Sequence, residues 1–408
     1  MRQTNRILPV YSGDVSGACS ALFEMGGMVV IHDPSGCYST YDTHDETRWY
    51  DTDSLIFLTG FTERDAMLGN DKKLIEDTAQ AAALYRPRFI ALCNSPIPYL
   101  NGTDFAGVCR VLEKRTGVPV FHVRTNGMHD YVQGVSQAFA QLAETVLVEE
   151  AVTAESTSFA GGPLKVNVLG MTPLDFAAPG AAEALEDKLE KASLRLHACW
   201  GMGRGVQSIG SSARADVNLA VSSSGEGAAQ VLRERFGTPA VFGVPCGAFS
   251  ERLLRETEKA AGDRPGQFTV PFLEVPENAA ARRTVILIGE PVVMGSLAAA
   301  LRMESGGSTK TVVAAATENS APFIRKDRDF SFFGEEELAK RLRVLAREAD
   351  SRGERIAVAA DPLYRPVCPE GAELFPVPHL AFSGRIFLDR MPDLFEGDCA
   401  SIMGGKWI

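Results

Sequence analysis

The amino-acid sequence predicts an α/β fold of three Rossmann-like domains, each a mainly parallel sheet flanked by helices. Short apolar runs bounded by turn residues alternate with stretches of helical periodicity, as is typical of parallel sheets covered on both faces. Two breaks divide this alternation into three units. The length of 408 residues also suits two or three domains of roughly 150 residues each.

The first unit is expected to span residues 1–155. Its strands are predicted at Gly27–His32, Ser54–Thr59, Arg88–Cys93 and Val118–Val123, and its helices at Asp71–Tyr85, about Phe105–Thr116 and about Tyr131–Glu149. The first of these helices should end before Pro87, because the residue before a proline disfavours helical backbone.

The second unit is expected to span residues 156–277 and begins within the linker Ala151–Pro163, which is small, polar and Gly-rich. Strands are predicted at Lys165–Gly170, Leu194–Cys199, Val217–Val221 and Ala240–Val244, and helices at Ala181–Ala192, near Gly205–Ala213, at Gly225–Phe236 and at Ala248–Ala261.

The third unit is expected to span residues 278–408, after a second break near Glu274–Ala281. Strands are predicted at Thr284–Gly289, Thr311–Ala315 and Arg355–Ala359, and helices at Val292–Arg302 and Glu335–Ala349. The three units are similar in kind, but no fixed-period repeat indicates a solenoid.

Composition narrows the class of protein. The chain is 45% hydrophobic and 23% charged, which is ordinary for a globular protein. Its net charge of -11 makes a nucleic-acid backbone an unfavourable partner. The opening MRQTNRILPV lacks the apolar core of a signal peptide, and no apolar run reaches membrane-spanning length. We therefore expect a cytoplasmic protein without membrane or nucleic-acid partners, in which stable disulfides are rare.

Three cysteines stand out because ligands of such sheets bind at the carboxyl ends of the strands. Cys19 precedes a helix-like segment, Cys37 follows the strand that ends near His32, and Cys93 closes the strand Arg88–Cys93. All three can converge at one end of one domain, where thiolates could bind an iron–sulfur cluster. Since the sequence around them has no CxxC, three buried thiols are the alternative.

The surrounding segments resemble those of the nitrogenase component 1 oxidoreductases. The similar segments in the first unit are GACSALFEMGGMVVIHDPSGC, Thr62–Gly69 (TERDAMLG), Tyr85–Cys93 (YRPRFIALC) and Leu100–Asp104 (LNGTD). Further along, DVNLAV, the Gly237-Thr238-Pro239 turn, Gly289-Glu290-Pro291 and PVPHLAFSG also look like family segments. The resemblance covers nearly the whole chain and is strongest over residues 13–130.

The resemblance implies that Cys19, Cys37 and Cys93 are cluster ligands at a subunit interface. Three thiolates per chain leave one iron of a [4Fe–4S] cluster to another ligand, whereas two chains could hold a P-cluster-like [8Fe–7S] cluster. We therefore expect a homodimer, or a heterotetramer with a paralogous subunit. Since the sequence contains no Walker A motif, a separate ATP-dependent iron–sulfur reductase protein is expected to donate the electrons.

The sequence departs from the family at the second metal site. Where true nitrogenases have a cysteine that holds the large molybdenum–iron cofactor, the alignment gives Ser222, whose neutral hydroxyl is a poor iron ligand. His379 lies close to the family's cofactor histidine, with a one-residue offset in register. A second metallocofactor is therefore left open. The chain is also shorter than typical nitrogenase subunits and nearer in size to nitrogenase-like reductases that act on tetrapyrroles.

Other residues at strand ends are candidates beside their structural alternatives. Cys246 is a candidate catalytic or substrate contact, with a turn thiol as the alternative, and His379 is the other candidate catalytic residue. Ser222 and Arg385 are candidate cofactor-binding residues, because a guanidinium can hold a carboxylate or an anionic cofactor. Weaker candidates are His44 and Arg365, the loop at Arg204, and His32 as a buried core histidine.

Three functions fit these observations. In the first, the chain is a redox subunit in which electrons pass from the cysteine cluster to a cavity between the three domains, lined by residues near Ser222, Cys246 and His379. In the second, it is a non-catalytic scaffold for metallocluster assembly. In the third, it is a periplasmic-type small-molecule binding protein with Rossmann-like lobes, which the missing signal peptide and the cysteines disfavour.

Overall fold

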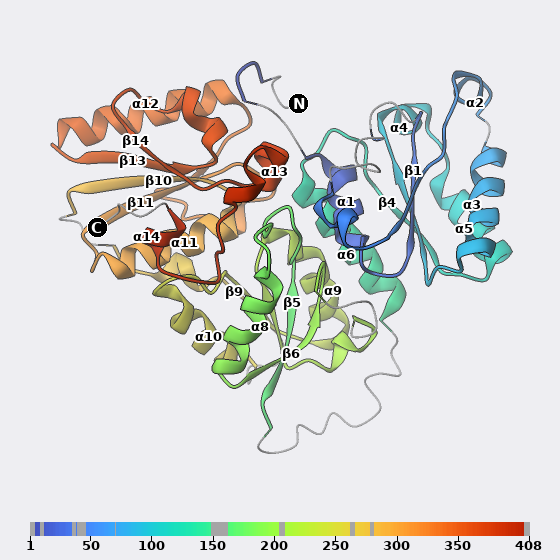
Figure 1. The fold of residues 1–408 in the computed structure, drawn as a ribbon, viewed down its shortest axis with the longest axis horizontal. Coiled ribbons are helices and arrows are strands. Elements are labelled where there is room, and N and C mark those ends of the chain that lie inside the picture. The colour runs from blue at the N-terminus through green and yellow to red at the C-terminus, as the bar shows by residue number, and fades with distance from the viewer. Residues whose placement is uncertain are drawn as a thin grey trace.

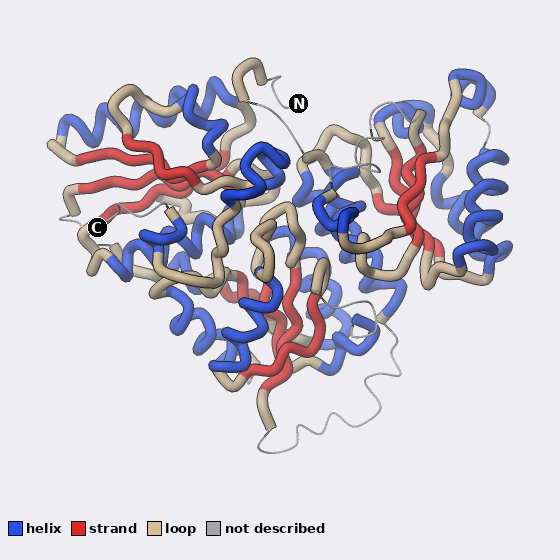
Figure 2. Tube along the Cα trace, viewed as in Figure 1, coloured by secondary structure: helices blue, strands red, loops and turns tan. Residues whose placement is uncertain are grey.

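The computed structural model describes residues 5–8, 12–34, 38, 46–69, 71–147, 162–203, 209–261, 266–277 and 281–403 of the chain. Three separate sheets, each flanked by helices, make up the described residues (Figures 1 and 2). Every pairing between strands of these sheets is parallel. The α/β fold class predicted from the sequence is therefore confirmed.

The first sheet has the strand order β2-β1-β3-β4. The strands are β1 (Met28–His32), β2 (Leu55–Leu58), β3 (Ile90–Asn94) and β4 (Val120–Val123), and the helices are α1 (Asp14–Leu22), η2 (Thr47–Tyr50), α2 (Glu63–Leu68), α3 (Asp71–Tyr85), α4 (Pro96–Asn101), α5 (Phe105–Thr116) and α6 (Tyr131–Val146). Helices α1 and α6 pack with one set of alternating strand residues, and α3 and α5 pack with the other set.

The middle sheet has the strand order β6-β5-β7-β8-β9. The strands are β5 (Leu164–Leu169), β6 (Leu194–Cys199), β7 (Val217–Ala220), β8 (Ala240–Phe242) and β9 (Phe268–Thr269), and the helices are α8 (Ala181–Lys191), η3 (Ile209–Arg214), η4 (Ser223–Gly225), α9 (Glu226–Phe236), α10 (Phe249–Ala260) and η5 (Pro271–Glu274). Helix α6 of the first unit packs along α9, so it belongs to both units.

The third sheet has the strand order β12-β11-β10-β13-β14. The strands are β10 (Arg283–Gly289), β11 (Thr309–Ala315), β12 (Phe330–Ser331), β13 (Arg355–Ala360) and β14 (Glu373–Pro376), and the helices are α11 (Pro291–Glu304), η6 (Ala321–Phe323), α12 (Glu335–Ser351), η7 (Pro362–Val367), α13 (Leu380–Ser383), η8 (Gly384–Arg390) and α14 (Cys399–Ile402). Figure 1 places α13 near the middle of the molecule, between the three sheets.

Each sheet has one position at which the strand order reverses. These positions lie between β1 and β3, between β5 and β7, and between β10 and β13. Connections leave the two strands toward opposite faces there, which opens a crevice at their carboxyl ends where ligands of such sheets bind. The residues that follow these six strands are therefore the first place to look for a site.

Helices α1 and α6 cross at very short range because glycines lie at the contact. A Cβ atom at Gly17 would overlap with the backbone of Tyr131, and one at Gly134 would overlap with the carbonyl oxygen of Asp14. The Asp14 carboxylate accepts hydrogen bonds from the backbone N–H groups of Asn126 and Gly127, both at 2.8 Å. These contacts fix α1 against the start of α6.

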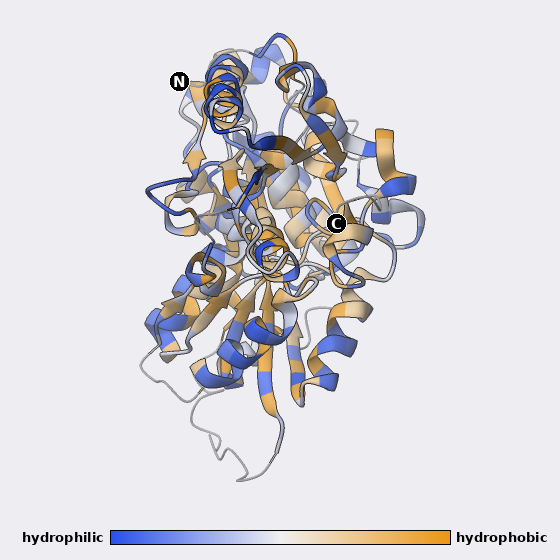
Figure 3. Cartoon of the chain, turned by 90° about the vertical axis from the view of Figure 1, so that its left-hand side faces the viewer, coloured by the Kyte–Doolittle hydropathy of each residue, from blue (hydrophilic) through white to orange (hydrophobic). Residues whose placement is uncertain are grey.

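The main hydrophobic core runs through all three units without a break. Trp200 is fully buried after β6; its indole packs edge-on against Phe139 of α6 and donates a hydrogen bond to Ser212 Oγ at 3.0 Å. Figure 3 shows hydrophobic residues concentrated in the strands and hydrophilic ones along the outer helices. In the described residues, no helix combines the length and the apolar composition required to cross a bilayer.

The predicted elements agree with the structure except where local signals are short. Helix α5 has the predicted bounds, whereas α2, α4, β9, β12, β14, α13 and α14 were not predicted. Cys19 was expected before a helix but lies inside α1. The prediction was wrong because Gly17 weakens the helical signal, and this glycine is there for close packing against Tyr131. The boundaries 155/156 and 277/278 stay predictions, and residues 204–208 and 278–280 lie outside the described residues.

Candidate functional site

Side chains that follow strands of all three sheets meet in one buried group. Tyr131 begins α6 after the first sheet, Asp175 follows β5 of the middle sheet, and His379 follows β14 of the third. Glu290 and Asp361 directly follow β10 and β13. We call these five residues the polar junction. Each is at least nine-tenths buried, so their contacts with one another, rather than water, determine their protonation and hydrogen bonding.

The Asp175 carboxylate is the centre of the polar junction. Its Oδ1 atom accepts a hydrogen bond from the Tyr131 hydroxyl at 2.6 Å and lies 3.0 Å from Nε2 of His379. Burial, followed by the charge of Asp175, holds the pKa of Tyr131 well above its usual range. The phenol therefore stays protonated and donates a hydrogen bond to the carboxylate.

The backbone of His379 is held as firmly as its ring. Its N–H donates to Oδ2 of Asp361 at 2.8 Å, and Oδ1 of Asp361 accepts from the N–H of Leu363 at 2.9 Å. The imidazole stacks on Phe382 with ring centroids 4.5 Å apart. The position of His379 is therefore set by the third sheet, while its ring reaches the middle one.

Glu290 joins the third sheet to the middle sheet beside Asp175. Its carboxylate accepts hydrogen bonds from the backbone N–H groups of Ser223 at 2.9 Å and Val293 at 2.7 Å. Burial, followed by the charge of Asp175, raises the pKa of the Glu290 carboxyl. Two buried acids close enough to repel each other favour a state in which Glu290 holds a proton.

The predicted cofactor contact Ser222 lies next to this link. Its hydroxyl oxygen accepts hydrogen bonds from the N–H of Ser224 at 3.2 Å and from the Ser224 hydroxyl at 2.9 Å, so it caps η4. Its neighbour Ser223 donates to Glu290. The structure therefore brings Ser222 and His379 to the same region. The hydroxyl oxygen of Ser222, however, already accepts hydrogen bonds within its own turn.

A cavity of about 260 Å³ lies beside the polar junction. Tyr131 and Phe382, which both contact the His379 ring, form part of its wall. Met128 and Phe333, also in the wall, are 54% and 64% exposed, so the cavity reaches the surface. It lies between the first and third units, and neither Ser222 nor Cys246 is among its described lining residues.

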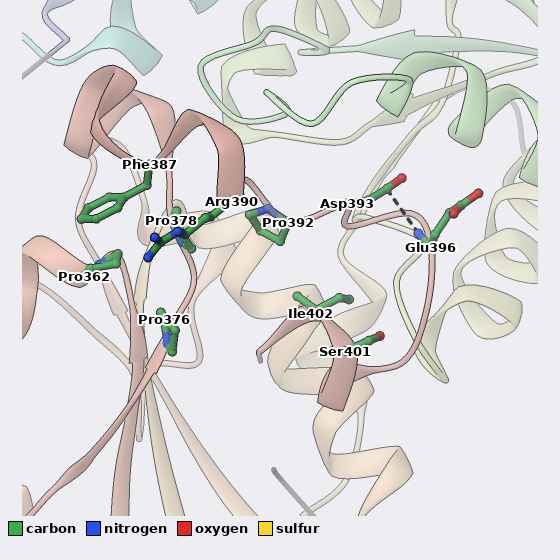
Figure 4. A pocket seen from close by; sticks show the side chains of 10 residues that line it. All are labelled: Pro362, Pro376, Pro378, Phe387, Arg390, Pro392, Asp393, Glu396, Ser401 and Ile402. Atoms are coloured by element: carbon green, nitrogen blue, oxygen red, sulfur yellow. Dashed lines mark hydrogen bonds between the residues drawn. The ribbon is translucent and has the colours of Figure 1, made fainter. Parts of the chain in front are cut away.

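A second cavity, of about 540 Å³, lies at the outer edge of the third sheet (Figure 4). Its walls combine four prolines and two apolar side chains with charged residues and a serine: Pro362, Pro376, Pro378, Pro392, Phe387, Ile402, Arg390, Asp393, Glu396 and Ser401. None of the site residues predicted from the sequence lines it. Two of its lining residues, Pro362 and Pro378, are next in sequence to Asp361 and His379 of the polar junction.

Cys19 and Cys93 lie on the same face of the first sheet. Cys19 is in α1, which packs on β3, and Cys93 is on the side of β3 that faces α1 and α6. Both side chains are fully buried. We call this side of the sheet the cysteine face. Cys37 and His44 lie outside the described residues, so the structure tests only two of the three predicted ligands for proximity.

The donor set at the cysteine face suits iron–sulfur chemistry but is not complete by itself. Thiolates are the usual ligands of such clusters, and the two described cysteines share one buried face. In the described parts of the chain, no three His, Cys, Asp or Glu side chains are grouped so as to hold a metal ion. A cluster at this face would need further ligands beyond these two cysteines.

Arg48 fastens the cysteine face to the middle unit. Its guanidinium donates to the carboxylates of Glu46 and Glu24 at 2.8 and 2.9 Å. It also donates to the carbonyl oxygens of Ser20 in α1, at 2.7 Å, and Gly201 after β6, at 2.9 Å. The helix that carries Cys19 is therefore bonded to the middle unit next to that cysteine.

The other predicted candidates lie apart from the polar junction. Cys246 is buried, and burial raises the pKa of its thiol to about 12; burial likewise raises the pKa of Cys199 to about 12 and of Cys109 to about 11. Arg385 is half-buried and donates to the Tyr50 hydroxyl at 3.2 Å. The roles predicted for Cys246 and Arg385 stay predictions.

Sequence reasoning missed four of the five residues of the polar junction. A signal for two of them was present, because Glu290 and Asp361 are acids between a buried strand and a proline, which is the pattern of a helix cap at a strand end. Both carboxylates do cap the helices that follow. Asp175 lies six residues beyond its strand, and nothing in its local sequence marks it.

Comparisons with known proteins point to one family. The model of the "Nitrogenase component 1 type Oxidoreductase" family matches residues 14–318. The nitrogenase molybdenum-iron protein alpha chain of Azospirillum brasilense is 27% identical over 52% of this chain and 44% of its own length. The nitrogenase iron-molybdenum cofactor biosynthesis protein NifE of Klebsiella pneumoniae is 28% identical over 52% and 47%.

The chain thus spans less than half the length of these curated relatives in the matched regions. Two solved structures, "Nitrogenase Cp1 at pH 5" and "Nitrogenase Cp1 at pH 6.5", are similar with TM-scores of 0.54 and 0.56. They are 16% and 14% identical and cover 87% and 92% of this chain, and 73% and 85% of their own. These structures support the fold.

Proposed function

We propose, from the premise that this chain belongs to the nitrogenase component 1 type oxidoreductase family, that it is an electron-transferring subunit of a nitrogenase-like complex. Cys19, Cys37 and Cys93 hold an iron–sulfur cluster at a subunit interface. A separate ATP-dependent reductase protein donates electrons, which are delivered to a substrate or cofactor between the domains. The proposal keeps the cytoplasmic location predicted from the sequence.

The observation that carries this proposal is the shared position of two cysteines distant in sequence. Cys19 and Cys93 are 74 positions apart in numbering, yet both lie buried on the cysteine face. Cys37 follows β1, the strand that pairs with β3 in the register Ile31 to Cys93. Parallel neighbours end at the same edge, so the loop that carries Cys37 starts beside Cys93.

A cluster held by this chain needs ligands from elsewhere. A [4Fe–4S] cluster would take one further ligand, and a P-cluster-like [8Fe–7S] cluster would take the cysteines of two chains. The proposal therefore includes a homodimer or a heterotetramer with a paralogous subunit. When bound, the cluster supplies one-electron transfer; the chain supplies thiolates, a dry apolar surround and, through Arg48, a fixed helix.

The polar junction is the proposed delivery point. His379 is the proposed catalytic residue, because it is buried at the carboxyl ends of the strands and one ring nitrogen, Nδ1, has no hydrogen-bond partner in the described residues. The proposed route of access is the cavity of about 260 Å³, whose wall includes Tyr131 and Phe382 beside the His379 ring. Ser222 borders the same region, while Cys246 and Arg385 are proposed as more distant contacts with a substrate or a second metallocofactor.

A non-catalytic scaffold for metallocluster assembly is the second candidate. The similarity to cofactor biosynthesis proteins named NifE supports it, as does serine at position 222, where true nitrogenases have a cofactor cysteine. A scaffold would hold a cluster only temporarily. Transfer of an intact cluster to an acceptor apoprotein supports the scaffold, whereas electron flow that continues only during turnover supports the enzyme.

Anaerobic purification followed by iron and sulfide counts and EPR tests the cluster proposal. The wild type should contain iron and sulfide in near-equal amounts, and Cys37→Ala should lose the cluster signal. Cys109→Ala is the matched control, because Cys109 packs in the opposite face of the first sheet. Unchanged iron in Cys37→Ala, or equal losses in both variants, would contradict the ligand assignment.

A further inference from the structure

The hydrogen bonds around Asp175 determine where the proton of the His379 ring lies. Oδ1 of Asp175 accepts from the Tyr131 hydroxyl at 2.6 Å. The same oxygen lies 3.0 Å from Nε2 of His379. A carboxylate oxygen that already accepts from one donor has only lone pairs to offer a second. Nε2 must therefore carry a proton and donate a hydrogen bond to Oδ1.

The other nitrogen of the ring is then defined. With the proton on Nε2, Nδ1 of neutral histidine carries a lone pair. Nδ1 is buried, and within the described residues it has no hydrogen-bond partner. His379 as a whole is 4% exposed. Buried polar atoms are nearly always paired, so an unpaired ring nitrogen is available to a ligand, and two residues that contact the ring, Tyr131 and Phe382, line a cavity.

The orientation of the ring is fixed from three sides. Phe382 stacks on one face, with centroids 4.5 Å apart and planes at 28°. The backbone N–H of His379 is bonded to Asp361 at 2.8 Å. Nε2 is bonded to Asp175, which is itself held by a tyrosine at the first turn of α6. A rotation that exchanged the two nitrogens would break the bond to Asp175.

We infer that Asp175, held by Tyr131, is a positioning residue that keeps the ring proton of His379 on Nε2 and so presents Nδ1 to the ligand of this site. The inference rests on the proposed function, which makes His379 the catalytic residue. The ligand is a hydrogen-bond donor or a metal centre, since a bare imidazole nitrogen accepts a proton or coordinates a metal. Asp175 and Tyr131 act through His379.

The alternative is that Tyr131 and Asp175 have a purely structural role. Tyr131, Asp175 and His379 come from three units, so their bonds would hold the units together whatever Nδ1 does. A glutamine at position 379 can still donate its amide to Asp175 but has no equivalent of Nδ1. Near-native thermal stability of His379→Gln is thus expected under both roles. The two roles are distinguished by the tautomer of the His379 ring.

The experiment is ¹⁵N NMR of protein labelled only at its histidines. The chain has six histidines, and the resonances of His379 are identified by their loss in His379→Gln. The wild type should show one tautomer, with a proton on Nε2 and a bare Nδ1. In Asp175→Ala the Nε2 proton should exchange with solvent at least about tenfold faster, as expected after loss of a hydrogen bond.

A wild-type spectrum with the proton on Nδ1, or on both nitrogens at neutral pH, would overturn the inference. So would unchanged exchange in a folded Asp175→Ala protein. If that variant does not fold, Tyr131→Phe replaces it, with a smaller acceleration expected and unchanged exchange counted against the inference. The measurement needs no iron, so a failed iron count contradicts the proposed function separately from the tautomer result.

Discussion

The cysteine face and the polar junction differ in how far this chain completes each site. At the cysteine face, two buried cysteines share a surface, and the proposed third ligand, Cys37, lies outside the described residues. At the polar junction, three units of the same chain supply side chains bonded at 2.6–3.0 Å. Under the proposed function the first site would depend on assembly, whereas the contacts of the second form within one folded chain.

The two regions are therefore recognisable in different ways. A resemblance in short motifs proposes cluster ligands even where the ligand set would need a second chain. Packing finds residues such as Asp175 that no motif marks. Variants that affect both regions, one region or neither can test this contrast.

Gly134→Ala should have the largest effect because it affects both regions. The new Cβ would overlap with the carbonyl oxygen of Asp14 and push α1 away from α6. Since the overlap is with backbone, we expect a loss of about 4 kcal/mol in stability, above the usual range for overpacking. Urea unfolding measures it. Gly210→Ala is the control, with nothing within 4 Å of its Cβ; equal stability of the two variants would contradict the close crossing.

Arg48→Met should affect the cysteine face alone. It removes the guanidinium but keeps much of the side-chain volume, leaving Glu46 buried without its partner. A loss of about 3 kcal/mol is expected for breaking a buried ion pair. The control is Arg255→Met, whose pair with Glu251 is exposed, and whose expected change is below about 0.5 kcal/mol. Similar unfolding midpoints in urea would show that Arg48 does not anchor α1.

Glu290→Gln should change how the stability of the polar junction depends on pH. Burial and Asp175 raise the folded-state pKa of Glu290 above its unfolded value, so its contribution is fully present below the unfolded pKa. That contribution is lost as pH rises through the folded pKa. The variant should therefore gain stability relative to the wild type between about pH 4.5 and neutral pH. Thermal melts across this window measure the difference, and parallel curves would sink the prediction.

Arg385→Ala should have the smallest effect, because it lies in neither region. Its contacts include the hydrogen bond to the Tyr50 hydroxyl and the approach of its guanidinium to that ring, 5.3 Å from the centroid. Tyr50 is 69% exposed, so we expect a loss of about 0.5 kcal/mol. A loss as large as that of Arg48→Met would reveal a structural role for Arg385.

The sequence predicted the strands and long helices because each has a strong periodic signal. Buried strands such as β3 and β10 are uninterrupted apolar runs, and α5 has a capping aspartate and a terminal glycine. Helix α1 was misread because its Gly17, Ser16 and Ser20 are weak helix formers, and the reason for Gly17 is contact with a helix more than 110 residues away.

The candidate site was predictable only in part for the same reason. His379 was found through a segment that resembles a family, and two acids of the polar junction had a local capping signal. Tyr131 and Asp175 read as an ordinary helix start and an ordinary loop acid. Their meeting depends on how three sheets pack, and that is information no local window of sequence contains.

Helix α6 has a consequence that reaches beyond either region. Its first turn carries the tyrosine that steadies Asp175, and its flank lies directly against the helix that carries Cys19. With glycines at the crossing, there is no compressible layer of side chains to absorb movement. A displacement of α1 would therefore have to move α6 with it, and with α6 the tyrosine that is bonded to Asp175. The two regions are thus joined by one rigid helix crossing.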